Sequence, residues 1–366
     1  MSAGVFMKAL ILVGGLGTRL RPLTINTPKA MMPVLNRPFM AHVIDHLRKH
    51  GVDEIILTRG HLAKQMESYF GDGSKLGITI RYIDESRPLG TAGGIKNCEQ
   101  YLNDTFFALN GDVFSTINLT EMLKAHRGKG AVATIALTPV ENPSAFGLVE
   151  TESDGRIKRF IEKPKPDEMT TDMINAGCYI LEPEVLGYIQ HDTVTSIERE
   201  TFQSLLKNHR PFYAYNDRES YWIDMGNRDK YCQLNMDMLT GRCPCPALSS
   251  GVQTGEGTVV DSSAKLEGRV VVGNNCRIGA GVTIAGPAIF GDNCTISDNS
   301  FIGNAVFWNG VKVGNNSSID NSILADNCLV SECSRISTSA LADGVFIPSS
   351  MILIDSQIWP GTILSN

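Results

Sequence analysis

The chain has 366 residues, of which 42% are hydrophobic and 20% are charged, and its formal net charge at pH 7 is −6. This is the composition of an ordinary globular protein, and the length allows two domains. The negative charge argues against a nucleic-acid partner, because surfaces that bind nucleic acid are usually basic. The longest apolar run near the N-terminus is too short to span a bilayer, and no cleavage site of a signal peptide follows it. We therefore interpret this run as the first buried strand of a cytoplasmic protein and expect no membrane partner.

The nine cysteines suggest neither a disulfide framework nor a zinc site, because no two of them have CxxC spacing. The unusual case is Cys243-Pro244-Cys245, for which a soft-metal or redox role is the alternative. Metal sites usually need further ligands nearby in the sequence, which argues against this alternative. We expect reduced cysteines in packed or linker positions.

From Lys8 to about Leu239, apolar strand-like runs alternate with amphipathic helical runs. The opening series is KALILV, PFMAHVIDHLRKHG, DEIILT, HLAKQMESYF and GITIRYI, which predicts the order βαβαβ. Pro38 suits the first turn of the first helix, and Gly51 suits the position after its end. This alternation predicts an α/β fold with a mostly parallel sheet, in which ligands bind at the carboxyl ends of the strands.

A six-residue repeat begins after a linker at residues 241–250. An apolar residue recurs every six positions, and a mostly small residue stands four positions after each. The apolar positions are Val260, Leu266, Val272, Ile278, Ile284, Phe290, Ile296 and Ile302, and the small ones are Ala264, Val270, Cys276, Val282, Ala288, Cys294, Ser300 and Val306. The period predicts a solenoid with three short strands per coil and Gly, Asn or Asp at its corners. It resembles the hexapeptide repeat of left-handed β-helices.

We therefore predict a left-handed parallel β-helix over residues 251–366. The period slips near Trp308 to Val313 and near Leu324, where we expect corner loops or irregular coils. Many hexapeptide-repeat proteins are acyltransferases with a histidine base, but no histidine lies in this region. We interpret the β-helix as a scaffold for a homo-oligomer or as a regulatory surface. Its ten acidic and five basic residues are interpreted as a solvated face.

The stretch VGGLGTRLRPLT, residues 13–24, follows the first strand and combines three glycines with two arginines. A glycine-rich turn after a strand exposes backbone N–H groups that can bind a phosphate. The P-loop pattern is absent, and the dinucleotide pattern GxGxxG fails because Leu20 occupies its last position. The second strand also ends in Thr58-Arg59-Gly60, without an acidic residue to bind a ribose.

The pattern GGxGTRLxPLT followed by PK resembles the signature of the sugar-phosphate nucleotidyltransferases. The resemblance implies a Rossmann-like nucleotidyltransferase domain over residues 1–240. In this family a sugar 1-phosphate attacks the α-phosphorus of a nucleoside triphosphate and pyrophosphate leaves, a reaction that needs positioning and charge neutralisation rather than a general base. Arg19 is implied to meet the leaving phosphates, and Lys29 the α-phosphate or the attacking one. The implied nucleotide-binding residues of the turn are Gly14, Gly15, Gly17 and Thr18.

Two aspartates match the metal ligands of this family. Asp112 follows the strand-like FFALN, and Asp224 follows an apolar run in YWID. Magnesium often takes only one or two carboxylates and completes its shell with phosphates and water. We expect Mg²⁺ at Asp112 and Asp224, the alternative for a lone aspartate being a turn or helix cap. Arg218 or Arg228 could add positive charge near Asp224, although positions on a helix surface are the simpler interpretation.

The segment RIKRFIEKP resembles the second signature of the family, F-x-EKP. This implies that Lys163 binds the sugar phosphate and that Glu162 binds sugar hydroxyls, an exposed Glu–Lys pair being the alternative. Gly147 in SAFGLVE and Asn175 in INAGCYIL match the sugar pocket of the family.

The segment DESRPLGTAGG, residues 84–94, matches the one that contacts the base and the sugar in this family. Glu85, Leu89, Gly90 and Thr91 are the candidates, and a helix that opens near Thr91 can offer amide donors. The LGTAG form, INAGCYIL and the later repeats most resemble the mannose-1-phosphate guanylyltransferases. This favours GTP and mannose 1-phosphate, with Glu85 selecting guanine. The alternatives are a thymidylyl-, uridylyl- or adenylyltransferase acting on glucose 1-phosphate, or a regulatory subunit without activity.

Overall fold

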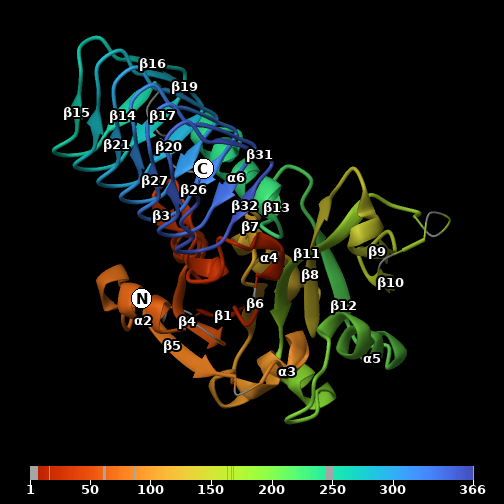
Figure 1. Ribbon diagram of the computed structural model, residues 1–366. Coiled ribbons are helices and arrows are strands. Elements are labelled where there is room, and N and C mark those ends of the chain that lie inside the picture. The colour runs from red at the N-terminus through yellow and green to blue at the C-terminus, as the bar shows by residue number, and fades with distance from the viewer. Residues whose placement is uncertain are drawn as a thin grey trace. The chain divides into compact units, whose positions relative to one another are not determined.

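The computed structural model describes residues 7–15, 17–60, 63–85, 87–162, 164–165, 167, 169–244 and 251–365. They form two compact units (Figure 1). The sheet unit consists of residues 1–15 and 40–224, and the β-helix unit consists of residues 16–39 and 225–366. The short segment 16–39 thus groups with the C-terminal part of the chain. Within the described residues, no helix has the length and apolar character needed to cross a membrane.

The main sheet of the sheet unit has nine strands among the described residues. Its path is β10-β9-β11-β6-β1-β4-β5, and β8 pairs with β11 and β12. The strands are β1 (Met7–Leu12), β4 (Val52–Arg59), β5 (Thr79–Asp84), β6 (Phe106–Asn110), β8 (Ala133–Pro139), β9 (Gly147–Thr151), β10 (Ile157–Glu162), β11 (Met173–Leu181) and β12 (Phe212–Asn216). The run β6-β1-β4-β5 is parallel, as the alternation predicts. The antiparallel pairings of β11 with β6, β8 and β9 extend it.

The two helices predicted between the first strands are present as α1 (Phe39–Lys49) and α2 (Ala63–Phe70). Pro38 is not in the helix, because it pairs with Pro33 in the small ladder of β2 (Pro33–Val34) and β3 (Arg37–Pro38). Gly51 follows α1 with a φ of 81°, as expected of a residue after a helix end. The other helices are α3 (Gly90–Asn97), α4 (Leu119–Gly128), α5 (Phe202–Lys207) and α6 (Arg228–Thr240), and the shorter helical turns include η1 (Thr18–Leu20), η2 (Lys29–Met31), η3 (Ser74–Leu76), η4 (Glu99–Tyr101), η5 (Pro143–Ala145), η7 (Pro183–Tyr188) and η8 (Ile197–Thr201).

The core of the sheet unit lies where the parallel strands meet the antiparallel ones. Leu10 of β1, Phe106 of β6 and Tyr179 of β11 are fully buried in one cluster. Phe202 of α5 joins the same cluster, with its ring centroid 5.3 Å from that of Tyr179. Burial of such large side chains is the main favourable contribution to folding, so this cluster fixes the strand ends that carry the site.

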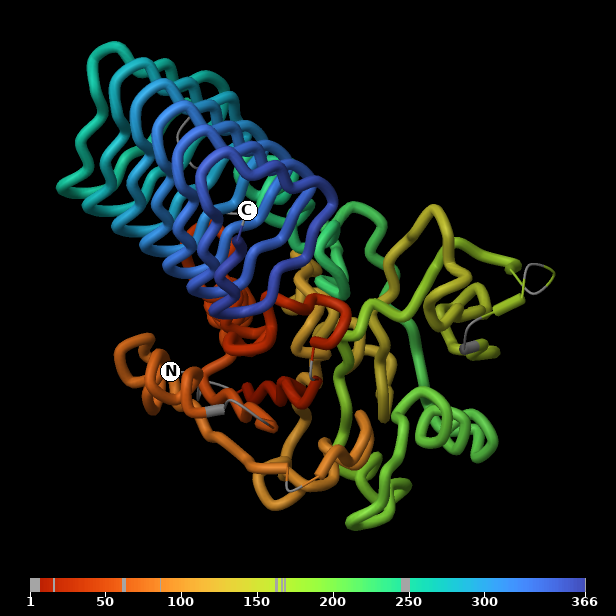
Figure 2. Tube along the Cα trace, viewed as in Figure 1, coloured from red at the N-terminus to blue at the C-terminus, as the bar shows by residue number. Residues whose placement is uncertain are grey.

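The C-terminal coils form the predicted left-handed β-helix (Figures 1 and 2). Its strands stack in three parallel sheets. The first sheet contains β14 (Val252–Thr254), β17 (Val270–Val272), β20 (Ala288–Phe290), β23 (Val306–Phe307), β26 (Ile323–Leu324), β29 (Ala340–Leu341) and β32 (Gln357–Ile358); the second contains β15 (Val259–Val260), β18 (Arg277–Ile278), β21 (Thr295–Ile296), β24 (Lys312–Val313), β27 (Leu329–Val330) and β30 (Phe346–Ile347); the third contains β16 (Lys265–Glu267), β19 (Thr283–Ala285), β22 (Phe301–Gly303), β25 (Ser318–Asp320), β28 (Arg335–Ser337) and β31 (Ile352–Ile354). The repeat positions from Val270 to Val306 are buried, whereas Val260 in the first coil is 36% exposed.

The slip in the six-residue period has a regular origin. Ile284 pairs with Ile302, but Ile302 pairs with Ile319 and Ile319 with Ile336, so the coil shortens by one residue. The missing residue is at the corner between the third and first sheets. Positive φ values mark this corner in each later coil, at Asn304, Asn321, Thr338 and Asp355. The expectation of loops or irregular coils is therefore wrong, because a shorter corner simply repeats.

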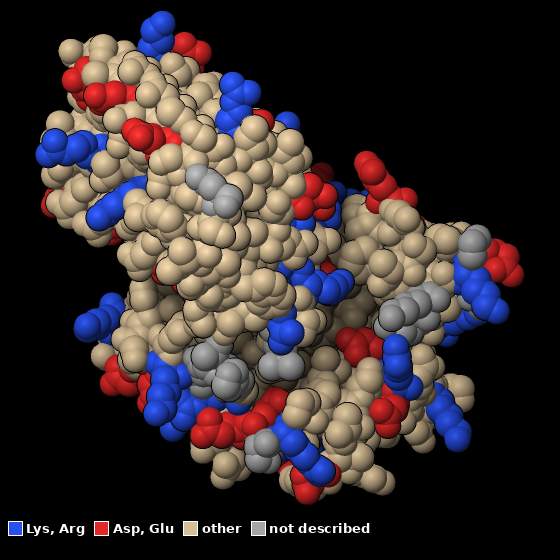
Figure 3. Space-filling view, viewed as in Figure 1, with Lys and Arg blue, Asp and Glu red and all other residues tan. Residues whose placement is uncertain are grey.

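Several aspartates of the β-helix have structural partners. On the face of the coils that Figure 3 shows, most of the surface is formed by uncharged residues. Oδ1 atoms accept backbone N–H groups of the preceding coil in the pairs Asp292 with Asn274, Asp298 with Ala280, Asp326 with Asn309, and Asp343 with Asp326, over 2.7 to 3.3 Å. Three of the four, Asp292, Asp326 and Asp343, are half-buried, so the interpretation of the acidic residues as merely a solvated face is wrong for them. Asp298 is exposed, in agreement with that interpretation.

Candidate functional site

The two predicted metal aspartates are brought to neighbouring strands of the sheet unit. Asp112 directly precedes β7 (Val113–Ser115), and Asp224 is the last residue of β13 (Trp222–Asp224). The two strands pair antiparallel, with Asp224 opposite Val113. Both aspartates are half-buried. Residues that are far apart in the sequence therefore present two carboxylates from adjacent backbone positions.

The turn that presents Asp112 depends on Gly111. β6 ends at Asn110, which pairs with Leu12 of β1. The Gly111 N–H donates to the Leu12 carbonyl oxygen over 2.9 Å, and a Cβ at Gly111 would lie 2.5 Å from that oxygen. Because a side chain cannot approach so closely, only glycine allows the chain to turn here. The turn delivers Asp112 to the carboxyl edge of the parallel strands, where α/β proteins bind ligands.

Glu85, the predicted base-reading residue, lies against the first glycine turn. Its N–H donates to the Arg59 carbonyl oxygen over 3.0 Å, directly after β5. A Cβ built on Gly14 would lie 3.1 Å from its carboxylate, and a Cβ built on Gly94 would lie 2.8 Å from it. Burial raises the pKa of the Glu85 carboxyl group, and a hydrogen bond with the Thr58 side chain opposes this shift. Two predicted nucleotide residues, Gly14 and Glu85, are thus brought into contact.

Backbone amides at the start of α3 form hydrogen bonds within the sheet unit. The N–H groups of Ala92 and Gly93 donate to the Thr195 carbonyl oxygen over 2.9 and 3.4 Å. A Cβ on Gly90, whose φ is 74°, would lie 2.6 Å from the same oxygen. Gly90 therefore has a packing role, and these two amides serve the fold. Leu89 is buried, and its carbonyl oxygen accepts the Thr195 N–H.

Thr91 is linked to Asn175 through two residues that the sequence analysis did not single out. The Thr91 hydroxyl donates to Glu198 over 3.2 Å, and the Tyr179 hydroxyl donates to the other oxygen of Glu198 over 3.2 Å. Asn175 donates to the Tyr179 hydroxyl over 2.8 Å. This series of hydrogen bonds connects a predicted nucleotide-binding residue with a predicted sugar-binding residue. Glu198 follows a serine cap and carries no motif of its own, so only the fold reveals it.

The predicted sugar residues meet in the antiparallel part of the sheet. Gly147 begins β9 and pairs with Glu162, the last residue of β10. The next residue of β9, Leu148, pairs with Ile174, which precedes Asn175. Lys163 and the side chain of Glu162 lie outside the described part of the chain, so their predicted roles remain predictions.

Trp222 links the strand that carries Asp224 to neighbours of the predicted sugar-binding residues. It lies two residues before Asp224 on β13, and its Nε1–H donates to the Ala176 carbonyl oxygen over 2.9 Å. Its ring packs edge-on against Phe146, with 5.5 Å between the ring centroids. Ala176 and Phe146 are chain neighbours of predicted sugar residues. An aromatic residue two positions before the predicted metal ligand Asp224 was the sequence signal that could have identified Trp222.

The two arginines considered near Asp224 have other placements. Arg218 forms two hydrogen bonds with the carboxylate of Asp172, over 2.8 and 3.0 Å. It lies after β12 in a segment that is not helical, so its expected position on a helix surface is wrong. Arg228 is the first residue of α6, in agreement with that interpretation.

Residues 17–39, called the signature segment below because they carry most of the signature motif, fold back on themselves within the β-helix unit. Gly17 has a φ of 58°, and its carbonyl oxygen accepts the Thr24 hydroxyl over 2.8 Å. A Cβ on Gly17 would lie 3.2 Å from Thr24 and 3.5 Å from the Cβ of Lys29. Arg19, in η1, is exposed, as is Thr18. The turn thus places Gly17 and Lys29 side by side.

The same segment is held by α6 and the coils. The buried Tyr231 of α6 donates its hydroxyl proton to the Pro33 carbonyl oxygen over 2.6 Å and accepts the Nε1–H of Trp308 over 2.9 Å. Asn36 donates to the Phe290 carbonyl oxygen over 2.7 Å. Further hydrogen bonds run from the Leu35 N–H to Asn235 and from Asn26 to Asp343. The residues that carry the signature cations are therefore part of the β-helix unit.

Two known sequence families match the chain. The profile described as Nucleotidyl transferase matches residues 8–241. The chain belongs to the nucleotidyl transferase family. A second profile, described as EIF2B subunit epsilon LbH domain, matches residues 249–353.

Similar proteins specify the class of this nucleotidyl transferase. Mannose-1-phosphate guanylyltransferase of Mycobacterium tuberculosis is 41% identical over 285 residues, which cover 76% of this chain and 79% of the relative. UTP–glucose-1-phosphate uridylyltransferase of Synechocystis sp. is 37% identical over 318 residues, which cover 81% and 82%. The crystal structure of HddC from Yersinia pseudotuberculosis, solved also in complex with GMP-PN, has 27% identity and a TM-score of 0.54, covering 63% of this chain and 98% of HddC. This nucleotidyl transferase is thus an enzyme related to sugar-1-phosphate nucleotidyltransferases.

Enzymes of this family use a divalent metal ion and take a nucleoside triphosphate and a sugar phosphate. The residues of this nucleotidyl transferase fit such an ion, because Asp112 and Asp224 supply hard carboxylate oxygens from adjacent backbone positions. The Oδ1 atom of Asn110 is buried and has no hydrogen-bond partner among the described residues, so an additional oxygen is available at the same edge. Those residues contain no cluster of three or more His, Cys, Asp or Glu side chains suited to a metal. Substrate oxygens and water would complete the shell.

Proposed function

We propose that this nucleotidyl transferase transfers a guanylyl group from GTP to mannose 1-phosphate, forming GDP-mannose and releasing pyrophosphate. The observation that carries the choice of base is the carboxylate of Glu85 beside Gly14 and Gly94. Guanine presents its N1–H and its 2-amino group side by side, and a carboxylate can accept both together. Uracil and thymine present one N–H between two carbonyl oxygens, which a carboxylate would repel.

The relatives support the same assignment. The Mycobacterium tuberculosis relative, which is named for mannose and guanylyl transfer, has the higher identity, 41% against 37% for the uridylyltransferase of Synechocystis. Uridylyl transfer to glucose 1-phosphate is the second candidate, because the Synechocystis relative covers slightly more of this chain. The mannose-type LGTAG segment at residues 89–93 favours the first candidate.

The proposed reaction requires little covalent chemistry from the protein. A phosphate oxygen of the sugar 1-phosphate attacks the α-phosphorus in line, and pyrophosphate leaves; the attacking phosphate is ionised at neutral pH, so no base is needed. Backbone amides of Gly14, Gly15, Gly17 and Thr18 bind the triphosphate. Arg19 neutralises the leaving phosphates, and Lys29 the α-phosphate or the attacking phosphate.

The sugar phosphate is bound in the antiparallel part of the sheet. Lys163 holds its phosphate, and Glu162 and Asn175 hold its hydroxyls, with Gly147 allowing the sugar to approach the backbone. We propose Mg²⁺ as the metal, held by Asp112 and Asp224; when bound it neutralises phosphate charge. The proposal divides the chain into a catalytic domain at residues 1–240, a linker at 241–250 and a β-helix at 251–366 that supports a homo-oligomer. Because the proposed substrates are charged metabolites, we propose the cytoplasm as the compartment of the enzyme.

Pyrophosphate release tests the assignment directly. We expect turnover to be fastest with GTP and mannose 1-phosphate in a grid of GTP, UTP, ATP and dTTP against mannose 1-phosphate and glucose 1-phosphate. A preference for another triphosphate would reject the choice of base. An absence of turnover with every pair would favour a regulatory subunit.

The aspartate pair has its own test. We expect Asp112→Ala and Asp224→Ala to lower turnover at least about a thousandfold with little change in melting temperature, because the metal supplies several kcal/mol of charge stabilisation. Asp104→Ala is the control, since Asp104 is exposed and precedes β6, whereas Asp112 follows that strand. Turnover at the wild-type rate in either variant would remove that residue from the metal site.

A further inference from the structure

We propose that Arg59 is a positioning residue for base recognition: its side chain holds the strand end that carries Glu85, without itself contacting the nucleotide. This inference rests on the proposed role of Glu85 and extends it to a part of the fold that no signature motif covers. Arg59 is the last residue of β4, and Asp84, its register partner, is the last residue of β5. The two residues thus terminate adjacent parallel strands at the edge where ligands bind.

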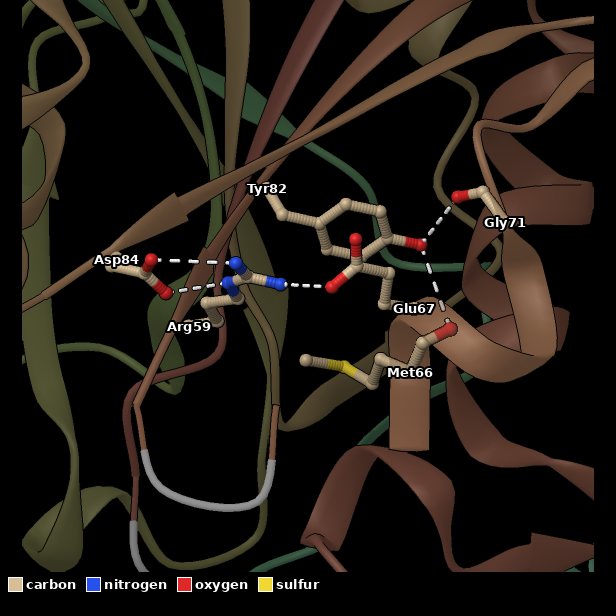
Figure 4. A network of polar contacts seen from close by, with 6 residues as sticks. All are labelled: Arg59, Met66, Glu67, Gly71, Tyr82 and Asp84. Carbon is tan, nitrogen blue, oxygen red and sulfur yellow. Dashed lines mark hydrogen bonds and ion pairs between the residues drawn. The ribbon is translucent and has the colours of Figure 1, made fainter. Parts of the chain in front are cut away.

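The guanidinium of Arg59 bridges three elements (Figure 4). Its Nε–H donates to Asp84 over 2.5 Å, and a second nitrogen donates to the other carboxylate oxygen of Asp84 over 3.3 Å. Its third nitrogen donates to Glu67 of α2 over 2.6 Å. Such a planar fork binds carboxylates with fixed geometry. The side chain of Arg59 therefore ties the ends of β4 and β5 to α2.

An aromatic ring restricts the same guanidinium. Its central carbon lies 5.4 Å from the centroid of the Tyr82 ring, and the Tyr82 hydroxyl donates to the Gly71 carbonyl oxygen after α2 over 2.8 Å (Figure 4). The Arg59 side chain is only 18% exposed, although its partners Asp84 and Glu67 are 74% and 54% exposed. Exposed ion pairs contribute little to global stability. The network is therefore better suited to fix local geometry than to stabilise the whole fold.

Arg59 acts on Glu85 from the opposite face of the sheet. Side chains alternate along a strand, so Arg59 and Asp84 lie on one face while Thr58 and Glu85 lie on the other. The last backbone hydrogen bond of the ladder runs from the Glu85 N–H to the Arg59 carbonyl oxygen. The Thr58 hydroxyl accepts the N–H of Val13, the residue before Gly14, over 3.2 Å. The strand end that Arg59 holds is thus also attached to the first glycine turn.

Removal of the Arg59 charge would release the end of β5 from α2. Asp84 and Glu67 would then be two carboxylates without the cation that joins them, and their repulsion would favour separation of the β5 end from α2. Glu85, which directly follows Asp84, would gain freedom of movement. Nucleotide binding would have to restrict that freedom again, which weakens binding.

The test compares two arginines of the same strand pair. Arg59→Met should raise the KM for GTP about tenfold, within the range that misplacement of a binding group costs, while kcat and the KM for mannose 1-phosphate change less than about twofold. Arg81→Met is the matched control. Arg81 lies on β5, pairs with Glu54 of β4 over 2.5 Å and lies 5.5 Å from the Tyr101 ring centroid, but it is remote from Glu85 in the ladder. The control should leave the KM for GTP unchanged.

A double-mutant cycle tests whether Arg59 acts through Glu85. We expect Arg59→Met to have little further effect on the KM for GTP in a Glu85→Gln background, since the two changes then remove the same interaction. Independent effects that multiply would reject the inference, as would an equal KM shift in Arg81→Met. If Arg59→Met does not fold, Arg59→Lys replaces it; lysine keeps the charge but cannot bridge both carboxylates, so an intermediate rise in KM is expected.

The outcome is separable from that of the proposed function. All variants are assayed with the triphosphate that the wild-type enzyme prefers. If this is not GTP, the proposed base is wrong, and the KM shift for the preferred triphosphate still decides the role of Arg59. If the wild-type enzyme prefers GTP and Arg59→Met keeps the wild-type KM, the inference is wrong while the proposed function stands.

Discussion

A single hydroxyl group offers a sharp test of how the signature segment is held. Tyr231→Phe removes the oxygen that accepts the Trp308 Nε1–H over 2.9 Å and donates to the Pro33 carbonyl oxygen over 2.6 Å. Tyr231 is fully buried, and Trp308 is 2% exposed. The variant keeps the ring and its packing, so its effect reports on the two hydrogen bonds. Both bonds lie within the β-helix unit, so the expected loss of stability concerns this unit.

The expected cost follows from the groups left behind. A buried donor without a partner costs about 1–3 kcal/mol, and Trp308 cannot reach water. Pro33 is half-buried, so we assign about 1 kcal/mol to the loss of the hydrogen bond that its carbonyl oxygen accepts. We therefore expect the free energy of unfolding of the β-helix unit to fall by about 2–4 kcal/mol. Pro33 belongs to the same segment as Arg19 and Lys29, which we propose to neutralise the substrate phosphates. We therefore expect turnover to fall as well while the protein is still folded.

Urea unfolding followed by circular dichroism measures the first effect, and pyrophosphate release at 25 °C measures the second. Tyr213→Phe is the control. Tyr213 is a half-buried tyrosine of the sheet unit, and its interactions with Lys129 and Arg156 are made by the ring, which the substitution keeps. A Tyr231→Phe variant with the unfolding midpoint of the wild type would show that these hydrogen bonds do not hold the segment. Unchanged turnover despite lower stability would show that the segment does not need this support.

Two further expectations concern pH and backbone packing. Burial, followed by the charge of His50, lowers the pKa of His46 from 6.5 to about 4. The unfolded chain then binds more protons between pH 6.5 and 4, so the free energy of unfolding should fall by about 1–2 kcal/mol as the pH drops from about 7 to about 5. Urea titrations at pH 7 and 5 should show a smaller decrease for His46→Gln, and an equal decrease would exclude His46 as the cause. Gly111→Ala should destabilise the protein by more than about 2 kcal/mol and lower turnover, because its Cβ would meet the Leu12 oxygen, whereas Gly128→Ala, with open space around it, should be neutral or stabilising in thermal melts. Equal melting temperatures for the two alanine variants would contradict this.

The features predicted correctly from the sequence are those encoded by local patterns. The βαβαβ order follows from apolar periods within each segment, and the β-helix follows from a six-residue period that every coil repeats. Short motifs also singled out candidate site residues around Gly14, Asp112 and Asp224, and the roles of these residues remain predictions. The period slip was visible too, but its meaning was not, because a shorter corner and an inserted loop both shift the same pattern; only the strand register separates them.

The sequence by itself determined the family signature, the two kinds of repeat and the chemistry that two aspartates and two signature cations can support. The tertiary structure decided which residues meet: Asp224 beside the strand after Asp112, Glu85 against Gly14, and Arg59 with Asp84 and Glu67. It also decided that residues 16–39 belong with the coils, through Tyr231 and Pro33, which are 198 positions apart in the chain. Such contacts have no local pattern, because they depend on strand pairing and burial between distant segments.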